Sequence, residues 1–261
     1  MPVPLVNTTR CGPLVILELA RPESGNALSS ALVTELTAAF GAAPAGGARA
    51  VVLAGAGRHF CTGADLAELA ATVDAPEEER VVDAERLAGL YAAVLRCPLL
   101  TVAAVHGAAF GGGMGLAAAC DLVIAGQDVR IQFSEARLGF VPALISVFLP
   151  RRVPPAHLAK LFLDPEPLGP ESARDVGLVD EIASDPRVTA ERLATDACRK
   201  VAPSAVAETK RLLLDVTLPQ LDRHLADAAR ANARQRAHPD CRRGLAAFLA
   251  TKNLPDWVDL D

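Results

Sequence analysis

One stretch, residues 98–121, constrains the fold of this chain more than any other. A β-branched, apolar run from Leu99 to Val105 stops at His106-Gly107, and three consecutive glycines, Gly111 to Gly113, open a small-residue helix that ends near Cys120. Consecutive glycines let a ligand approach the backbone closely, and the first N–H groups of a helix have no intrahelical acceptor. The stretch therefore predicts a strand, a tight loop and a helix whose N-terminus can bind a phosphate or a developing oxyanion.

The same order of elements occurs earlier in the chain. The apolar run from Ala50 to Ala54 predicts a strand that is buried on both faces, as in a parallel sheet. Gly55 to Gly63 then form a glycine-containing loop, and Ala64 to Leu69 have helical spacing. Two such units in one sheet can place two sets of backbone N–H groups around one point, which is what an oxyanion hole requires. They are equally consistent with ordinary strand-to-helix turns, in which glycine permits a sharp reversal.

The remaining periodicity predicts an α/β chain with helices at its C-terminal end. Leu14 to Leu19 are a strand candidate, and residues 74–96 have the spacing of an amphipathic helix. From residue 188 onward, only helices are predicted. We therefore expect a core of strands and helices over residues 1–199 and an appended helical region over residues 200–261.

Composition argues against several classes of function. The 261 residues carry a formal net charge of −5 with one Tyr and one Trp, so neither a basic face nor aromatic platforms for nucleic-acid bases are expected. The six cysteines are scattered without C-x-x-C spacing, which argues against a disulfide framework or a metal site. The N-terminal residues have no basic flank followed by an apolar segment, so we expect a cytoplasmic protein that does not enter a membrane.

A dinucleotide site is the main rival use of the glycine stretch. Gly113, Gly115 and Ala118 fit the pattern G-x-G-x-x-A after a strand. Between Gly113 and the next strand at Leu122, however, we expect too few residues for the crossover helix of a parallel unit. The acidic residue expected about twenty positions on would be Glu135, but a further strand precedes it. A dinucleotide-dependent oxidoreductase is therefore kept only as an alternative.

Glu135 is the candidate general acid or base. It follows a predicted strand in an apolar neighbourhood near Pro142, where partial burial would raise its pKa. From sequence alone, an ordinary surface carboxylate paired with Arg137 is the simpler interpretation. His59 and His106 lie beside the glycine loops, but no metal-ligand spacing supports them, and no G-x-S-x-G motif indicates a serine hydrolase.

Several segments, in order along nearly the whole chain, resemble the crotonase superfamily, the enoyl-CoA hydratase/isomerase family. They are Arg21-Pro22 with Asn26-Ala27-Leu28; His59 to Leu66; Val102 to Gly107 with Gly111 to Gly113; Cys120-Asp121; Phe133-Ser134-Glu135 with Leu138-Gly139; and Ala173 to Val179. The resemblance implies a spiral of repeated ββα units followed by a helical region that joins subunits into homotrimers or hexamers. It also implies acyl-CoA thioester substrates, with coenzyme A entering as part of the substrate and no permanently bound cofactor.

The resemblance also implies roles for residues of this chain. The backbone N–H groups of Ala64 and Gly112 would hold the thioester oxygen, which favours an oxyanion hole over ordinary turns, and Glu135 would transfer protons. The resemblance further implies that ten residues bind the substrate and its coenzyme A: Asn26, Ala27, Leu28, Gly63, Asp65, Leu66, Gly111, Pro142, Phe248 and Lys252. Of these, Phe248 and Lys252 would reach the coenzyme A of the same or a neighbouring subunit.

One departure from the family pattern concerns the reaction itself. Hydratases of this family typically carry two glutamates that together hold one water, and the first of these positions is Gly115 here. With Glu135 alone, a proton shuttle between carbons, as in an isomerase, is easier to explain than water addition. The segment from Gly111 to Ser146 nevertheless resembles hydratases of methylglutaconyl type, so hydration stays our first expectation. A carboxylate of the substrate or of the helix over residues 77–96 would then complete the site; an isomerase and an inactive CoA-binding homologue are the alternatives.

Overall fold

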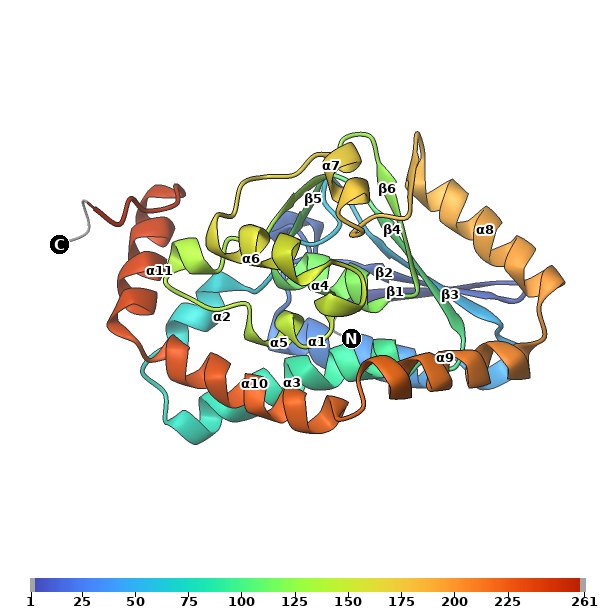
Figure 1. The fold of residues 1–261 in the computed structure, drawn as a ribbon, viewed down its shortest axis with the longest axis horizontal. Helices are drawn as coiled ribbons and strands as arrows, with labels where there is room; N and C mark the ends of the chain where they lie inside the picture. Colours follow the sequence, from blue (N-terminus) through green and yellow to red (C-terminus); the bar gives the residue numbers. More distant parts are fainter. Residues whose placement is uncertain (1–2, 259–261) are drawn as a thin grey trace.

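The computed structural model describes residues 3–258, which form two sheets with helices packed around them (Figure 1). The larger sheet has six strands in the order β1-β2-β3-β4-β6-β8, and the smaller one pairs β5 with β7. The strands are β1 (Val6–Cys11), β2 (Leu14–Leu19), β3 (Ala50–Gly55), β4 (Leu100–Val105), β5 (Ala108–Phe110), β6 (Leu122–Gly126), β7 (Arg130–Gln132) and β8 (Glu181–Ala183). Neighbouring strands of the larger sheet are parallel except for the pair β1 and β2.

Eleven α-helices are present in residues 3–258, together with short 3-10 turns. They are α1 (Ser30–Ala42), α2 (Leu66–Ala71), α3 (Glu77–Leu95), α4 (Gly112–Ala119), α5 (Ala143–Ser146), α6 (Pro155–Leu163), α7 (Pro170–Asp175), α8 (Pro186–Lys200), α9 (Pro203–Thr217), α10 (Leu221–Arg236) and α11 (Pro239–Thr251). Local chemistry explains several starts. Ser29 accepts a hydrogen bond from the N–H of Leu32 at 3.2 Å, and Asp185 accepts one from the N–H of Val188 at 3.0 Å.

Each turn of the chain combines a long strand, a short extended segment and a helix. In one turn β4 and β5 lead into α4, and the next long strand, β6, pairs in parallel with β4. The short segments form a second strip beside the larger sheet, because Cys61 is bridged to Ala109 and Leu28 to Ala64. This repetition confirms the spiral of ββα units, and it brings the loops before α2 and α4 together.

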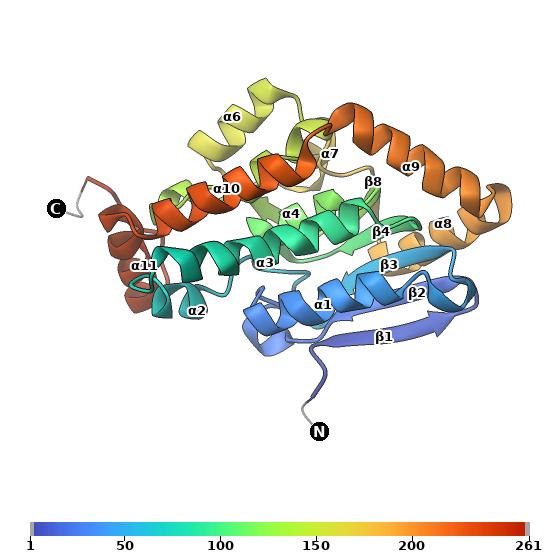
Figure 2. The same ribbon diagram turned by 90° about the horizontal axis from the view of Figure 1, so that it is seen from below.

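Helices cover both faces of the larger sheet. On one face α8 packs against β3, β4 and β6 over a small apolar cluster that includes Val52, Val102 and Ala190. On the other face α3 lies between α1 and α10, as Figure 2 shows, and this layer holds the main core. The chain then passes through α9 to α11. The division at residues 199 and 200 falls at the end of α8 and stays a prediction.

The structure corrects two expectations about the strands. The connection between β4 and β6 is a parallel crossover, although the segment after Gly113 was expected to be too short for one. The connection consists of the loop after β4, β5 and the eight residues of α4. Two strands also escaped prediction: β1, an edge strand with mostly polar and exposed residues, and β5, three residues inside the glycine-containing loop.

Candidate active site

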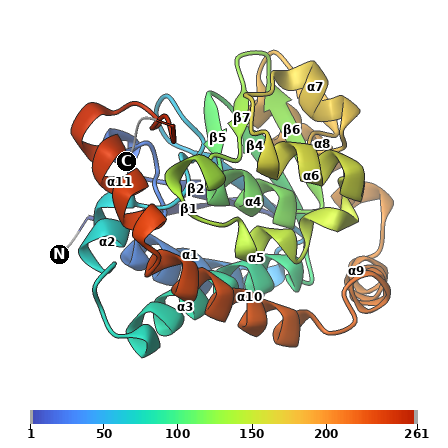
Figure 3. The same ribbon diagram turned by 60° about the vertical axis from the view of Figure 1, so that its left-hand side comes forward.

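A cavity of about 720 Å³ opens between the loops before α2 and α4 and the C-terminal helices. Its wall includes residues from the glycine loops, from the turn after β7 and from α5, α10 and α11. Figure 3 shows α2 and α11 at the same end of the molecule, where these two helices are in contact. Residues of both helices line the cavity at this end.

The two glycine loops touch each other at the cavity wall. A Cβ atom on Gly63 would lie 2.8 Å from the carbonyl oxygen of Phe110 and 3.7 Å from the backbone nitrogen of Gly112. Gly63 also has a φ of 91°, which side-chain-bearing residues rarely adopt. Only glycine at this position allows the first loop to pack directly on the second.

Two backbone N–H groups at this junction are not used by secondary structure. In the bridge between Leu28 and Ala64, the N–H of Leu28 donates to Gly63 at 2.8 Å and its carbonyl accepts from Asp65 at 3.4 Å, so the N–H of Ala64 points away from the bridge. Gly112 is the first residue of α4, and its N–H therefore has no intrahelical acceptor. Both residues line the cavity, where their N–H groups can stabilise a negatively charged oxygen.

Glu135 places a carboxylate against the same loops. A Cβ on Gly111, whose φ is 46°, would lie 2.7 Å from Oε1 of Glu135, so the glycine leaves room for the carboxylate. Oε2 is buried without a hydrogen-bond partner. Burial raises the pKa of Glu135 to about 7, against the smaller opposing effect of a hydrogen bond to its own backbone. Glu135 is thus a buried acid that can gain or lose a proton near neutral pH, and its position differs from that of an ordinary surface carboxylate.

The position of the absent second glutamate is closed by packing. A Cβ on Gly115 would overlap Cγ2 of Ile145 and would lie 3.5 Å from the hydroxyl oxygen of Tyr91. Ile145 belongs to α5 and is 3% exposed, so it has little space into which to move. The structure therefore leaves no room for a longer side chain at Gly115 without repacking of α5.

This packing predicts that the effect of Gly115→Ala on stability depends on the side chain at position 145. Gly115→Ala alone is expected to destabilise the protein by about 1–3 kcal/mol, because the new methyl group overlaps Ile145. In an Ile145→Ala background the same change is expected to be neutral or stabilising by up to about 1 kcal/mol, because Ala is favoured over Gly inside a helix. Urea unfolding of the four proteins measures both values. Equal effects of Gly115→Ala in the two backgrounds would contradict the overlap.

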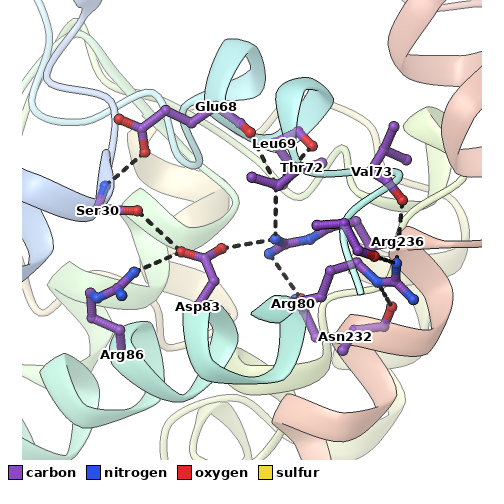
Figure 4. Close-up of polar contacts among 12 residues, drawn as sticks. Ser30, Glu68, Leu69, Thr72, Val73, Arg80, Asp83, Arg86, Asn232 and Arg236 are labelled. Atoms are coloured by element: carbon purple, nitrogen blue, oxygen red, sulfur yellow. Dashed lines mark hydrogen bonds and ion pairs between the residues drawn. The ribbon is translucent and has the colours of Figure 1, made fainter. Parts of the chain in front are cut away.

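A second, smaller cavity of about 60 Å³ lies next to the first and is lined by charged residues. There Asp83 of α3 accepts hydrogen bonds from Arg236 at 2.8 Å and from Arg86 at 3.0 Å, and Arg80 donates to the carbonyl of Ala233 at 3.1 Å (Figure 4). These contacts join α3 to α10. The expectation that a carboxylate of α3 completes the site is wrong, because Asp83 is held in this cluster and the glutamates of α3 are exposed.

The contacts between Asp83 and its arginine partners predict that loss of the Asp83 charge destabilises the fold. Asp83→Asn is expected to destabilise the fold by about 1–3 kcal/mol, because the side chain of Arg236, which is 5% exposed, would keep its buried charge without a carboxylate. Arg86→Gln removes a more exposed partner of Asp83 and is expected to change the stability by less than about 0.5 kcal/mol. Urea unfolding tests both variants. A midpoint of Asp83→Asn equal to that of the wild type would contradict this role.

The cavity gathers most, but not all, of the residues expected to bind substrate. Those on its wall are Ala27, Gly63, Asp65, Leu66, Gly111, Pro142, Phe248 and Lys252. The structure does not bring Asn26 to it: this side chain is fully buried, accepts a hydrogen bond from the N–H of Arg21 at 2.9 Å and donates to the carbonyls of Ala56 and His59. Leu28 lines the smaller cavity. The amide of Asn26 therefore makes hydrogen bonds that join two loops, and these bonds occupy its oxygen and its nitrogen.

Asp65 makes contacts that join two segments of the cavity wall. Its carboxylate accepts from both terminal nitrogens of Arg21 at 3.1 Å and from the N–H of Glu68 at 3.3 Å, so it caps α2. Arg21 donates in turn to the carbonyl of Ala27 at 2.7 Å. This ion pair joins the turn after β2 to the loop that carries Ala64.

Sequence reasoning missed Tyr91, which lines the cavity and donates a hydrogen bond to the carbonyl of Gly112 at 3.0 Å. The sequence nevertheless contains a pattern that could have identified Tyr91. Tyr91 is the only tyrosine of the chain, and it shares the inner face of α3 with Leu87 and Val94 at helical spacing. A residue with a polar tip in such a stripe needs a partner, because a buried hydroxyl without one is costly.

Other polar groups near the loops have structural partners. Nδ1 of His59 accepts from the N–H of Ala108 at 3.1 Å, and Nε2 of His106 lies 2.9 Å from the carbonyl oxygen of Gly57. Across residues 3–258 there is no group of three or more His, Cys, Asp or Glu side chains that could hold a metal ion. The helices of the described chain include none long and apolar enough to cross a membrane.

Comparisons with known proteins agree with this geometry. The profile of a family described as enoyl-CoA hydratase/isomerase matches residues 12–259. A candidate enoyl-CoA hydratase of Thermus thermophilus is 37% identical over 240 residues, which are 91% of this chain and 95% of that protein. An enoyl-CoA hydratase structure from Mycobacterium avium has a TM-score of 0.85 at 33% identity, covering 97% of this chain and 98% of the other. The chain is therefore an enzyme of the enoyl-CoA hydratase/isomerase family, within the crotonase superfamily.

Proposed function

We propose that this enzyme holds the thioester oxygen of an enoyl-CoA at the N–H groups of Ala64 and Gly112 while Glu135 transfers the protons. One observation carries the proposal: a carboxylate with a buried oxygen that has no hydrogen-bond partner and two unused backbone donors share one cavity. When the double bond is attacked or a proton is removed, negative charge develops on the thioester oxygen. Fixed N–H donors stabilise that charge more than they stabilise the ground state.

Hydration is the first candidate reaction, and one carboxylate is sufficient for it. Ionised Glu135 accepts a proton from water while the water oxygen bonds to the β-carbon and the π electrons move into the thioester to form an enolate. Protonated Glu135 then gives the proton to the α-carbon, so that the net change is the addition of one water. A pKa of about 7 suits a group that acts first as a base and then as an acid. The hydratase descriptions of the relatives support this choice.

Isomerisation is the second candidate, and the packing at Gly115 favours it. With Ile145 in the place of a second carboxylate, the site has one proton carrier and one fewer group to hold a water. Glu135 would then take a proton from the γ-carbon, which leaves a dienolate whose charge is on the thioester oxygen, and return the proton to the α-carbon. The double bond moves by one position and no water is consumed. The oxyanion hole serves both reactions in the same way.

The remaining parts of the proposal rest on the sequence resemblance. The coenzyme A of the substrate would lie along Ala27 and Leu66 toward Phe248 and Lys252, whose ammonium group can pair with a phosphate. An acyl group of methylglutaconyl type is the first one to test, and no permanently bound cofactor is needed for either reaction.

A homotrimer or hexamer is also part of the proposal. On α9, the side chains of Leu212, Leu213 and Val216 are about half exposed or more in the single chain, which supports a covered position in an assembly. The mass in solution, measured by light scattering, is expected to equal that of three or six chains. A monomer at micromolar concentration would contradict this part.

Incubation of the enzyme with a panel of enoyl-CoA thioesters in deuterated water, followed by mass spectrometry, tests the function. Hydration adds one D2O to the substrate, whereas isomerisation leaves the composition unchanged apart from exchanged deuterium and moves the double bond. Exchange at the α-carbon alone would indicate enolate formation without either net reaction. Binding of CoA thioesters without any of these outcomes would overturn the proposal and identify a CoA-binding homologue.

A further inference from the structure

The loop that carries Gly112 has no side chain of its own to hold it. Gly111, Gly112 and Gly113 are consecutive, and Gly111 has a φ of 46° and a ψ of −120°. Glycine has more backbone freedom than any other residue. An oxyanion hole is effective only when its donors are already in place, because donors that must reorient during the reaction lose part of their effect. Other parts of the fold must therefore fix this loop.

Backbone hydrogen bonds fix one side of the loop from Gly111 to Gly113. The N–H of Gly111 donates to the carbonyl of Gln132 at 2.8 Å, and the carbonyl of Gly111 accepts from the N–H of Gly115 at 3.0 Å. The first bond orients the peptide group before Gly111, and the second orients the peptide group that joins Gly111 to Gly112 and contains the N–H of Gly112. The next carbonyl, that of Gly112 itself, receives its side-chain contact from outside the helix.

That contact is the hydroxyl of Tyr91, which donates to the carbonyl of Gly112 at 3.0 Å. Tyr91 is fully buried, and its ring centroid is 5.1 Å from that of Phe148 with the ring planes tilted by 53°. A Cβ on Gly112 would lie 2.9 Å from the hydroxyl oxygen, so the phenol packs directly on the first turn of α4. A rigidly held donor thus restrains Gly112, a residue of the cavity wall whose N–H has no intrahelical acceptor.

We propose that Tyr91 is a positioning residue for the oxyanion hole: its hydroxyl holds the carbonyl of Gly112, in the peptide group that follows this residue, and so restricts rotation of the Gly112 backbone and keeps its N–H directed into the cavity. This inference rests on the proposed function, in which that N–H binds the thioester oxygen. Burial raises the pKa of Tyr91 well above 10, and Cys61 and Glu135, the titratable groups that influence it, act in the same direction. The phenol therefore stays protonated, and remains a donor, at every pH at which Glu135 titrates.

Tyr91→Phe tests the inference, because it removes the hydroxyl and keeps the ring that packs on Phe148. We expect kcat to fall about 3- to 10-fold, the effect of one hydrogen bond, with affinity for free CoA unchanged. Infrared difference spectra of a bound acyl-CoA with a ¹³C-labelled thioester carbonyl provide the second readout. In the wild type the carbonyl stretch is expected at a lower frequency than in water, and in Tyr91→Phe it is expected to move back toward the value in water.

Two further measurements separate positioning from packing. Phe148→Leu removes the ring contact without touching the hydroxyl, and it is expected to lower the melting temperature while the carbonyl frequency stays that of the wild type. Gly112→Ala, whose methyl group meets the hydroxyl, is expected to lower activity less in the Tyr91→Phe background than in the wild type. A wild-type kcat and carbonyl frequency in Tyr91→Phe would overturn the inference. A wild-type enzyme that does not shift the carbonyl at all would instead overturn the proposed function.

Discussion

Glu135→Gln is expected to lower the turnover of any enoyl-CoA substrate by about 10²- to 10⁴-fold, because the amide has the shape of the carboxylate but cannot carry the proton. Affinity for CoA should be unchanged, since the expected CoA-binding residues are elsewhere on the cavity wall. Steady-state kinetics and calorimetric titration with CoA measure the two effects. Glu68→Gln, which changes a carboxylate in the smaller cavity, is the matched control and should keep wild-type turnover. Unchanged turnover of Glu135→Gln would remove this residue from the mechanism.

The raised pKa of Glu135 gives this prediction a pH dependence. In the hydration direction the ionised form accepts the proton from water, so kcat/KM is expected to rise with pH up to about 7 and then level off. Stability follows the opposite trend. Because the folded protein holds this proton more tightly than the unfolded chain, the carboxyl destabilises the fold progressively as the pH rises from about 4.5 to about 7. Glu135→Gln should therefore increase the free energy of unfolding at pH 8 by about 1–3 kcal/mol and have little effect at pH 4. Melting temperatures at the two pH values measure this difference.

Gly112→Pro is expected to lower turnover by about 10²- to 10³-fold, because proline removes the N–H that we propose as an oxyanion donor. Proline is well tolerated at the first residue of a helix, which is the position of Gly112 in α4. Gly112→Ala is the matched control. It brings the same Cβ close to the hydroxyl of Tyr91 but keeps the N–H, so the difference between the two variants isolates the donor.

Circular dichroism and thermal melting show whether both variants of Gly112 are folded before their kinetics are compared. The expected result is a folded Gly112→Pro protein that binds CoA and has much lower turnover than Gly112→Ala. If the two folded variants have equal turnover, the N–H of Gly112 does not hold the thioester oxygen.

The periodicity of the sequence predicted most of the fold, because the buried strands are apolar on both faces. β3 is buried at every residue, and the run from Ala50 to Ala54 has no polar interruption. β1 escaped prediction for the opposite reason: it is an exposed edge strand whose residues from Asn7 onward face solvent, and β2 supplies its pairing. β5 has three residues and exists only because β7 and Cys61 lie beside it. Such strands depend on tertiary partners that no local pattern contains.

The same distinction applies to the site. Ala64 and Gly112 follow predicted strands and glycine loops, so their approach to one point was one of two interpretations that the order of elements left open. For Glu135 the sequence alone favoured an ordinary surface carboxylate, and the structure shows its burial. Asn26 shows the limit of that reasoning, because only the structure reveals that its amide is used by the loops around it. The closure of Gly115 by Ile145 was equally out of reach, since it depends on how α5 packs on α4. Contacts between elements distant in sequence, more than the elements themselves, decide how many carboxylates this site can hold.

The proposed oxyanion hole can be tested by a crystal structure of the enzyme with a saturated acyl-CoA, which keeps the thioester oxygen but has no double bond to react. We expect this oxygen to lie about 2.7–3.1 Å from the backbone nitrogens of both Ala64 and Gly112. We also expect the carboxylate of Glu135 to face the α- and β-carbons of the acyl chain. A thioester oxygen bound by other groups, with the acyl chain away from Glu135, would show that these residues do not form the catalytic site.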